Sequence, residues 1–253
     1  EFPYLPQIVK EKHVEISQFT LKDIIRQTVF SISDNENTKV MTGELFEITD
    51  NKLKVVSLDG HRISIRNVEL NNSYDNISVI IPGKTLIEIN KILNGGVDDI
   101  VKIYFTDKHI LFEFENTVVL SRLIEGEYYK IDKMLSSDYE TKITVNKKEM
   151  LDSIDRTTLL MKESEKKPVI IDIKDNSMGL AMNSSIGSMD EEIDAVKEGK
   201  DILIGFNPRF LIDALRVIDD EEITLYMINP KAPCFIRDKD ESYIYLILPV
   251  NFN

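Results

Sequence analysis

Hydrophobic positions along the chain follow a helix-type spacing in two places. Apolar residues recur at i, i+3, i+4 and i+8 in the first place, and much of that stripe returns in the second. Such spacing is typical of an amphipathic helix with one buried face. The two predicted helices have these apolar positions: Leu21, Ile24, Ile25 and Val29 in one, and Met150, Leu151 and Ile154 in the other.

Alternating apolar and polar residues also occur twice, at 45–55 and 170–180. In each stretch an Asp-Asn pair interrupts the alternation, at Asp50 and at Asp175. Alternation on both sides of such a pair predicts two antiparallel strands joined by a turn. The two stretches lie 125 positions apart, counted from Phe46 to Ile171. This offset indicates an internal repeat.

A second short helix and further strands complete each copy. The helices start near Lys84 and Arg209, again 125 positions apart. Their apolar positions are Leu86, Ile87 and Leu93 in one, and Leu211, Ile212 and Ile218 in the other. Apolar strands are predicted at 101–105, 111–114, 223–227 and 234–236. The pattern predicts two similar α+β domains, 12–135 and 136–253, each with two helices packed on antiparallel β-sheets.

Composition sets limits on the kind of protein. Of the 253 residues, 42% are hydrophobic and 30% are charged, which is enough to build a sizeable core. The formal net charge of −13 argues against a protein that binds nucleic acid tightly through electrostatics. No apolar run approaches the roughly 20 residues that span a bilayer, so we expect no membrane partner.

The sequence contains few cysteine and histidine residues that could bind a metal or take part in redox chemistry. The single cysteine, Cys234, excludes a disulfide framework and a cysteine-based zinc site. His13, His61 and His109 are too far apart in sequence to form a local metal motif. We expect no metal, no cofactor and a reducing, cytosolic setting.

Basic residues lie on single faces of the predicted helices. Lys84, Glu88 and Lys91 are spaced i, i+4 and i+7, and Arg209, Asp213 and Arg216 repeat the spacing 125 positions later. One interpretation is a solvated face with i, i+4 ion pairs. The other is a row of helices that presents sparse basic residues to a polyanion. The spacing leaves both open.

Several short motifs resemble one known family. They are Gly43-Glu44-Leu45-Phe46-Glu47, Ser57-Leu58-Asp59-Gly60-His61-Arg62-Ile63, Leu123-Ile124-Glu125-Gly126-Glu127-Tyr128-Tyr129 and Tyr245-Leu246-Ile247-Leu248-Pro249-Val250. Together they resemble the second and third domains of the bacterial sliding clamp, the beta subunit of DNA polymerase III. Residues 1–11 are similar to the linker that follows that family's first domain.

The resemblance implies a non-catalytic DNA polymerase processivity factor in the bacterial cytoplasm. In that family, two three-domain subunits form a ring around duplex DNA. The ring tethers the polymerase III catalytic subunit, the clamp loader and other proteins that carry a clamp-binding motif. The first domain is not matched, so we expect a piece of a longer protein, monomeric alone and a homodimeric ring at full length.

The resemblance also implies a hydrophobic cleft for partner peptides that contain a glutamine and aliphatic or aromatic residues. Met41, Leu246 and Leu248 could equally be ordinary core strand residues. The family often has proline where Tyr129 stands, so Tyr129 is expected to narrow the cleft. The implied cleft residues are Met41, Leu58, Gly60, His61, Arg62, Ile63, Tyr129, Met134, Leu246, Leu248, Pro249 and Val250.

Basic side chains that face DNA are implied by the same resemblance. Acidic neighbours such as Glu88 and Asp213 are expected to keep the attraction to phosphate weak. Leu159 and Leu160 resemble subunit-interface residues, although a local core role is an open alternative. The implied DNA-facing residues are Lys22, Arg26, Lys39, Lys84, Lys91, Lys148, Arg156, Arg209 and Arg216.

Two other functions are considered. One is a peptide-binding adaptor that keeps the clamp fold without acting on DNA. The other is a carboxylate-based hydrolase, prompted by the 44 acidic residues. The sequence contains no paired-carboxylate motif, phosphate loop or metal cluster that would support the hydrolase.

Overall fold

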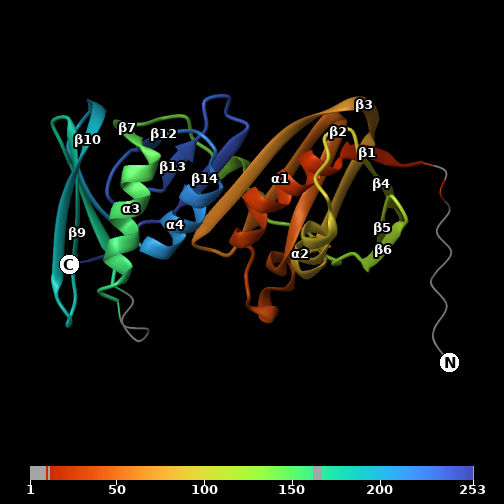
Figure 1. Cartoon of the computed structure of the whole chain (residues 1–253), viewed down its shortest axis with the longest axis horizontal. Coiled ribbons are helices and arrows are strands. Elements are labelled where there is room, and N and C mark those ends of the chain that lie inside the picture. Colours follow the sequence, from red (N-terminus) through yellow and green to blue (C-terminus); the bar gives the residue numbers. More distant parts are fainter. Residues whose placement is uncertain (1–9, 11, 162–166, 253) are drawn as a thin grey trace. The chain divides into compact units, whose positions relative to one another are not determined.

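The chain folds into two compact units. The computed structural model describes residues 10, 12–161 and 167–252, and its elements are labelled in Figure 1. The first unit contains residues 1–59 and 65–129, and the second contains 60–64 and 130–253. The units therefore divide after Tyr129, near the boundary at 135 that the sequence predicts. Of the predicted linker segment 1–11, all residues except Lys10 lie outside the described residues.

The first unit combines two helices with antiparallel strands. The strands β1, β4, β5 and β6 form a four-stranded sheet in the order β1-β4-β5-β6, and β2 pairs with β3. The first three residues of β3 group with the second unit. The elements in chain order are β1 (Val14–Ser17), α1 (Gln18–Thr28), the 3₁₀ helices η1 (Val29–Ser31) and η2 (Glu36–Thr42), β2 (Gly43–Leu58), β3 (Arg62–Pro82), α2 (Gly83–Ile92), β4 (Ile100–Phe105), β5 (His109–Phe114) and β6 (Thr117–Arg122).

Strand β2 turns back on itself near Asp50, as the sequence predicts. Asp50 has φ of 55°, in the left-handed region that aspartate tolerates in turns. The ammonium of Lys54 lies 3.9 Å from the carboxylate of Glu47. Seven residues of straight strand would separate these positions by about 20 Å, so the contact requires a turn between them.

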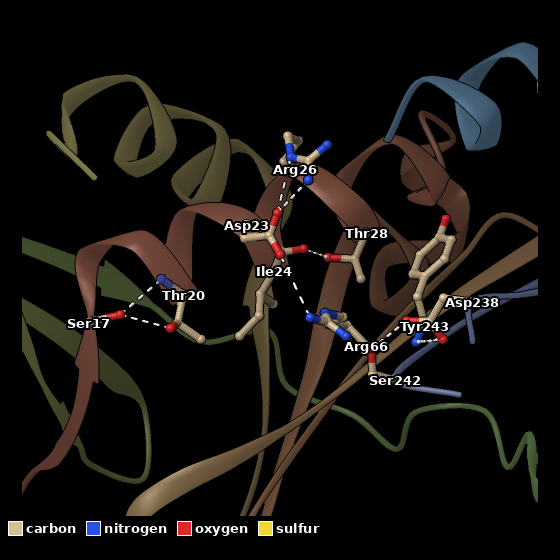
Figure 2. Close-up of polar contacts among 10 residues, drawn as sticks. All are labelled: Ser17, Thr20, Asp23, Ile24, Arg26, Thr28, Arg66, Asp238, Ser242 and Tyr243. Carbon is tan, nitrogen blue, oxygen red and sulfur yellow. Dashed lines mark hydrogen bonds and ion pairs between the residues drawn. The ribbon is translucent and has the colours of Figure 1, made fainter. Parts of the chain in front are cut away.

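Helices α1 and α2 pack against each other and against β2. Leu21, Ile24 and Ile25 of α1 are fully buried, which confirms the predicted stripe. Ser17 caps α1, because its hydroxyl accepts a hydrogen bond from the Thr20 amide (Figure 2).

On α2 the predicted apolar face is partly wrong. Leu86 and Leu93 are buried, but Ile87 is 36% exposed. Ile89, three residues after Leu86, takes the buried position, as the helical period requires.

The second unit repeats this plan with a longer sheet. Its strands are ordered β11-β8-β9-β10-β7-β12-β13-β14. Its elements in chain order are η3 (Asp132–Met134), β7 (Thr141–Asn146), α3 (Lys147–Thr158), β8 (Val169–Lys174), β9 (Ser177–Asn183), β10 (Ser188–Gly199), β11 (Ile202–Phe206), α4 (Pro208–Val217), β12 (Glu222–Met227), β13 (Cys234–Arg237) and β14 (Tyr243–Ile247).

The repeat inferred from the sequence is present in the structure. Helices α2 and α4 begin and end 125 positions apart. Asp175, at the turn between β8 and β9, has φ of 48°, close to that of Asp50. Helices α3 and α4 pack side by side, as Figure 1 shows within the second unit. The predicted α+β fold with antiparallel sheets is confirmed.

Candidate peptide-binding site and helix surface

Arg62 lies at the centre of a buried cluster in the second unit. Its guanidinium donates to the carboxylate of Asp213 at 2.6 Å. The carbon of the same guanidinium lies 4.3 Å from the centre of the Phe210 ring, within the range of a cation–π contact. Arg62 is only 8% exposed. Asp213 therefore takes at least one of the donors of Arg62, which the family resemblance implies as a cleft residue.

Tyr245 of β14 supports this cluster from the interior. Its hydroxyl donates to the backbone carbonyl of Phe210 at 2.9 Å, in the first turn of α4. Burial raises the pKa of Tyr245 well above its ordinary value, while the nearby charge of Arg62 opposes that rise. The tyrosine stays neutral and holds the helix start in place.

The C-terminal segment runs past this cluster as a strap with two backbone hydrogen bonds. The Leu248 amide donates to the carbonyl of His61, and the Val250 amide donates to the carbonyl of Gly205, both at 2.9 Å. A Cβ on Gly205 would lie 2.6 Å from the ring of Phe252 and 3.0 Å from the Val250 carbonyl oxygen. The absence of a side chain at Gly205 is what lets the segment lie so close to β11.

Apolar side chains remain exposed around the strap. Leu248 is 39% exposed and Val250 is 38% exposed. The ring of His61 stacks on that of Phe210, with centres 6.1 Å apart. We call the surface formed by His61, Phe210, Leu248 and Val250 the tail surface. It combines apolar walls with a few polar groups, as ligand sites commonly do.

The remaining predicted cleft residues divide into exposed and buried ones. Leu58, Ile63 and Leu246 are buried, at 5%, 6% and 3% exposure, in stretches of strand where successive residues on both faces are buried. The core alternative considered for Leu246 fits its burial, whereas Leu248 is 39% exposed. In the second unit, Gly60 is exposed, Pro249 within the strap is half-buried, and Met134 in η3 is 57% exposed. In the first unit, Met41 is half-buried and Tyr129 is 48% exposed.

Sequence reasoning missed Phe210, Asp213 and Tyr245 as members of this site. The sequence predicted that Asp213 lies on the same helix face as Arg209 and Arg216, because the three residues are spaced i, i+4 and i+7. Phe210 lies outside the predicted apolar stripe of α4. A large apolar residue in such a position could have been recognised as a candidate surface residue. Pairing between Asp213 and Arg62, 151 positions away, leaves no local signal in the sequence.

Most of the basic residues on the helices have acidic partners. The ion pairs have these distances: Arg26–Asp23 at 2.5 Å, Lys91–Glu88 at 2.7 Å, Lys148–Asp152 at 2.7 Å, Arg216–Asp155 at 3.3 Å and Lys84–Glu36 at 3.8 Å. Arg156 also pairs with Glu191 of β10. Figure 2 shows Asp23 between Arg26 and Arg66, with the Arg66 guanidinium 3.8 Å away. Among the described residues, no ion pair is formed by Lys39 or Arg209.

Lys22 has a backbone partner. Its ammonium donates to the backbone carbonyl of Leu93 at 2.8 Å, at the C-terminal end of α2. In the second unit, Lys147 donates to the carbonyl of Ile218 at the end of α4, at 2.6 Å. Each lysine satisfies a carbonyl that a helix end leaves without a partner and complements the helix dipole. Lys22 thus has a structural partner and keeps its positive charge.

Leu159 and Leu160 follow helix α3. Leu159 is 78% exposed, so it does not belong to a local core, and Leu160 is half-buried.

A buried carboxyl lies in the first unit. Glu44 is fully buried, and one of its oxygens accepts a hydrogen bond from the Thr28 hydroxyl at 3.1 Å. Thr28 also donates to the carbonyl of Ile24, as Figure 2 shows. The other oxygen of Glu44 has no hydrogen-bond partner among the described residues. Burial therefore raises the pKa of Glu44 well above its ordinary value, and burial also raises the pKa of nearby Tyr128.

Neither a metal site nor a membrane span is found in the part of the chain that the structure describes. No group of three or more His, Cys, Asp or Glu residues there could hold a metal ion. No helix there is long and apolar enough to cross a membrane.

Comparison with protein families identifies both units. The model for the central domain of the DNA polymerase III beta subunit matches residues 15–130. The model for the C-terminal domain of the same subunit matches residues 132–251. The chain belongs to the DNA polymerase III beta subunit family, the sliding clamps.

Individual sliding clamps agree with this assignment. The beta sliding clamp of Staphylococcus aureus (strain Mu50) is 34% identical over 253 residues, covering 99% of this chain and 67% of that protein. The crystal structure of the sliding clamp from Bacillus subtilis is 35% identical with a TM-score of 0.97, covering 100% of this chain and 68% of that one. The DNA polymerase III beta subunit structure from Eubacterium rectale is 65% identical with a TM-score of 0.97, covering 99% of this chain and 68% of that one.

The role of the chain follows from its family. It is a bacterial sliding-clamp chain with the role of a DNA polymerase processivity factor, and that role is non-catalytic. Its partners are DNA and the polymerase or other clamp-binding proteins. The family assignment excludes the hydrolase interpretation, and it disfavours an adaptor that does not act on DNA.

Proposed function

We propose that the tail surface binds short peptide segments of replication and repair proteins. The observation that carries this proposal is the strap of the second unit, which leaves Leu248 and Val250 partly exposed beside the stacked rings of His61 and Phe210. Aliphatic side chains on a fixed backbone next to an aromatic ring offer burial at about 25 cal/mol per Å² to an apolar ligand. Met134 of the same unit is 57% exposed and is a further apolar residue that could contact a peptide.

The proposed ligand is a peptide with a glutamine followed by aliphatic and aromatic residues. The apolar side chains of the peptide would contact Leu248, Val250 and Phe210, and the glutamine would find backbone and side-chain polar groups near His61. A short motif of this kind is expected to bind in the micromolar range, about −8 kcal/mol at 1 μM.

The test is a calorimetric titration of a polymerase-derived clamp-binding peptide into the chain. Deleting residues 248–253 is expected to weaken binding strongly, because the deletion removes the strap. A matched control is Ile186→Ser, which changes an apolar residue that is 54% exposed elsewhere in the second unit. Equal affinity for the full chain and the deletion variant would contradict the proposal.

We further propose that the four α-helices face duplex DNA. They carry nine basic and six acidic side chains, a net charge of +3, whereas the whole chain has a net charge of −13. A mildly basic surface on an acidic protein supports loose, nonspecific and salt-sensitive contact with phosphate. Lys39 and Arg209 are the strongest candidates, while Arg26, Lys84, Lys91, Lys148, Arg156 and Arg216 would act with their acidic partners.

The proposed assembly at full length is a head-to-tail homodimeric ring around DNA in the cytoplasm. The polymerase III catalytic subunit and the clamp loader are the proposed partners. Leu159, 78% exposed at the end of α3, and Leu160 are proposed to lie in the subunit interface. The 253-residue chain alone is expected to be monomeric, and a stable closed dimer in light scattering at micromolar concentration would contradict this.

A further inference from the structure

We infer that Asp213 is a positioning residue that determines which peptides the tail surface accepts. By occupying Arg62, it makes the surface favour neutral aromatic and aliphatic ligands over acidic ones. The inference rests on the proposed peptide-binding function of the tail surface.

The geometry begins with helix α4. Phe210 and Asp213 are spaced i, i+3, so they lie on the same face of the helix one turn apart. A single guanidinium can therefore lie over the ring and reach the carboxylate at once. Arg62 does both, with its carbon 4.3 Å from the ring centre and its nitrogen 2.6 Å from the Asp213 oxygen.

The exposures of the pair support an inward-directed arginine. The side chain of Arg62 is 9% exposed, whereas that of Asp213 is 37% exposed. The carboxylate is therefore the more solvent-accessible member of the pair. Arg62 contacts both this carboxylate and the Phe210 ring, and the same ring stacks with His61.

The chemical consequence concerns ligand carboxylates. Arginine binds carboxylates strongly, often with two parallel hydrogen bonds. With Asp213 already bound to Arg62, an acidic ligand would meet a satisfied guanidinium and the partly exposed Asp213 charge. With Asp213 neutralised, the positive charge of Arg62 would no longer be paired with this carboxylate and would attract a ligand carboxylate instead.

The backbone around this pair is fixed independently of Asp213. The Tyr245 hydroxyl holds the Phe210 carbonyl, and the Asn207 side chain caps α4 by accepting from the Arg209 amide at 3.0 Å. Replacing Asp213 should therefore alter the side-chain surface while leaving the start of α4 in position.

The test compares two peptides on the same variants by calorimetry. One peptide is a neutral glutamine-leucine-phenylalanine type, and the other has one neutral residue replaced by aspartate. The variants are Asp213→Asn and Asp213→Glu, with Asp155→Asn as the matched control, since Asp155 also pairs with an arginine of α4 in the second unit. Circular dichroism confirms that each variant is folded.

The expected result is a change in the ratio of the two affinities. Asp213→Asn should weaken the neutral peptide and shift the ratio toward the acidic peptide by about tenfold, the scale of one charge-assisted hydrogen bond. Asp213→Glu should keep the ratio of the parent chain, and Asp155→Asn should change neither affinity. An unchanged ratio in folded Asp213→Asn would overturn the inference.

A double variant covers the case in which Asp213→Asn does not fold. Arg62→Met combined with Asp213→Asn removes both partners and leaves no unpaired buried charge. It should bind the neutral peptide more weakly without any shift toward the acidic one, because no guanidinium remains. A shift toward the acidic peptide in the double variant would overturn the inference. If the parent chain binds neither peptide, the proposed function fails, and that outcome is separate from any effect of Asp213.

Discussion

The ammonium of Lys22 lies 2.8 Å from the carbonyl oxygen of Leu93 and thereby joins α1 to the end of α2. Lys147 makes the same kind of bond to Ile218 in the second unit, although the two lysines occupy different turns of their helices. In each unit, a lysine of the first α-helix thus donates to the carbonyl of the residue that ends the second α-helix. The recurrence indicates that the bond stabilises the relative position of the two helices.

Lys22→Met is expected to destabilise the first unit. The change removes a charge-assisted hydrogen bond and a favourable charge at a helix C-terminus, together worth about 1–2 kcal/mol. Urea unfolding followed by circular dichroism measures the loss. Lys91→Met, which removes an exposed side chain paired with Glu88, is the control and should have little effect on stability. Equal stability of the parent chain and Lys22→Met would contradict the assignment.

Asp152→Asn is expected to tighten nonspecific binding to duplex DNA. Asp152 pairs with the exposed Lys148 at 2.7 Å, so its removal leaves a free positive charge on α3. The logarithm of affinity should fall more steeply with the logarithm of salt, by up to about one unit of slope. Fluorescence anisotropy of labelled duplex across a salt series measures the slope. The control is Glu198→Gln, which removes the acidic partner of Lys142 on strand β7. An equal gain in DNA affinity for this variant would contradict a specific role for the helices.

Stability is expected to depend on pH through Glu44. Its pKa is raised in the folded chain by burial, so the folded state keeps a proton that the unfolded state releases. Stability should therefore fall as pH rises from the ordinary value near 4.5 toward the raised folded pKa. Glu44→Leu removes the buried carboxyl, and Thr28 keeps its bond to Ile24. The variant should be more stable than the parent at pH 8, by about 1–3 kcal/mol.

The measurement for Glu44 is a set of urea unfolding curves at pH 5 and pH 8. The difference between Glu44→Leu and the parent chain should grow with pH. Parallel pH dependence of the two proteins would mean that Glu44 does not titrate in this range.

Gly205→Ala is expected to displace the C-terminal strap. The added Cβ would meet the Phe252 ring at 2.6 Å and the Val250 carbonyl at 3.0 Å. Overpacking of this kind costs about 1–3 kcal/mol, and moving the strap relieves it. Limited proteolysis should release the C-terminal residues faster, while the helices stay protected. Gly179→Ala is the control, because its nearest contacts lie at 3.5 Å or beyond.

Local patterns predicted most of the fold. The stripe that begins at Leu21 and the turn at Asp175 are set by neighbours within a few residues, so spacing alone identifies them. The 125-residue repeat predicted that α2 and α4 would correspond. The pattern misplaced Ile87, because two adjacent apolar residues at a helix edge compete for one buried position.

The site was less predictable, because it depends on contacts far apart in the sequence. Its location near His61 and Leu248 came from the family resemblance rather than from any pattern. The pairing of Arg62 with Asp213 requires β3 and α4 to meet in the fold, which spacing does not encode. The bond between Lys22 and Leu93 was not predicted, because a carbonyl at the end of another helix is invisible in the sequence.

The most direct test of the account is residue-by-residue mapping of peptide binding by NMR. Titration of the labelled 253-residue chain with a polymerase-derived clamp-binding peptide should perturb the resonances of His61, Phe210, Leu248 and Val250. Resonances of the turn at Asp175 and of β5 should remain unchanged. Perturbations that cluster away from these four residues, with the tail surface unaffected, would contradict the assignment of this surface as the site where the clamp holds its partners.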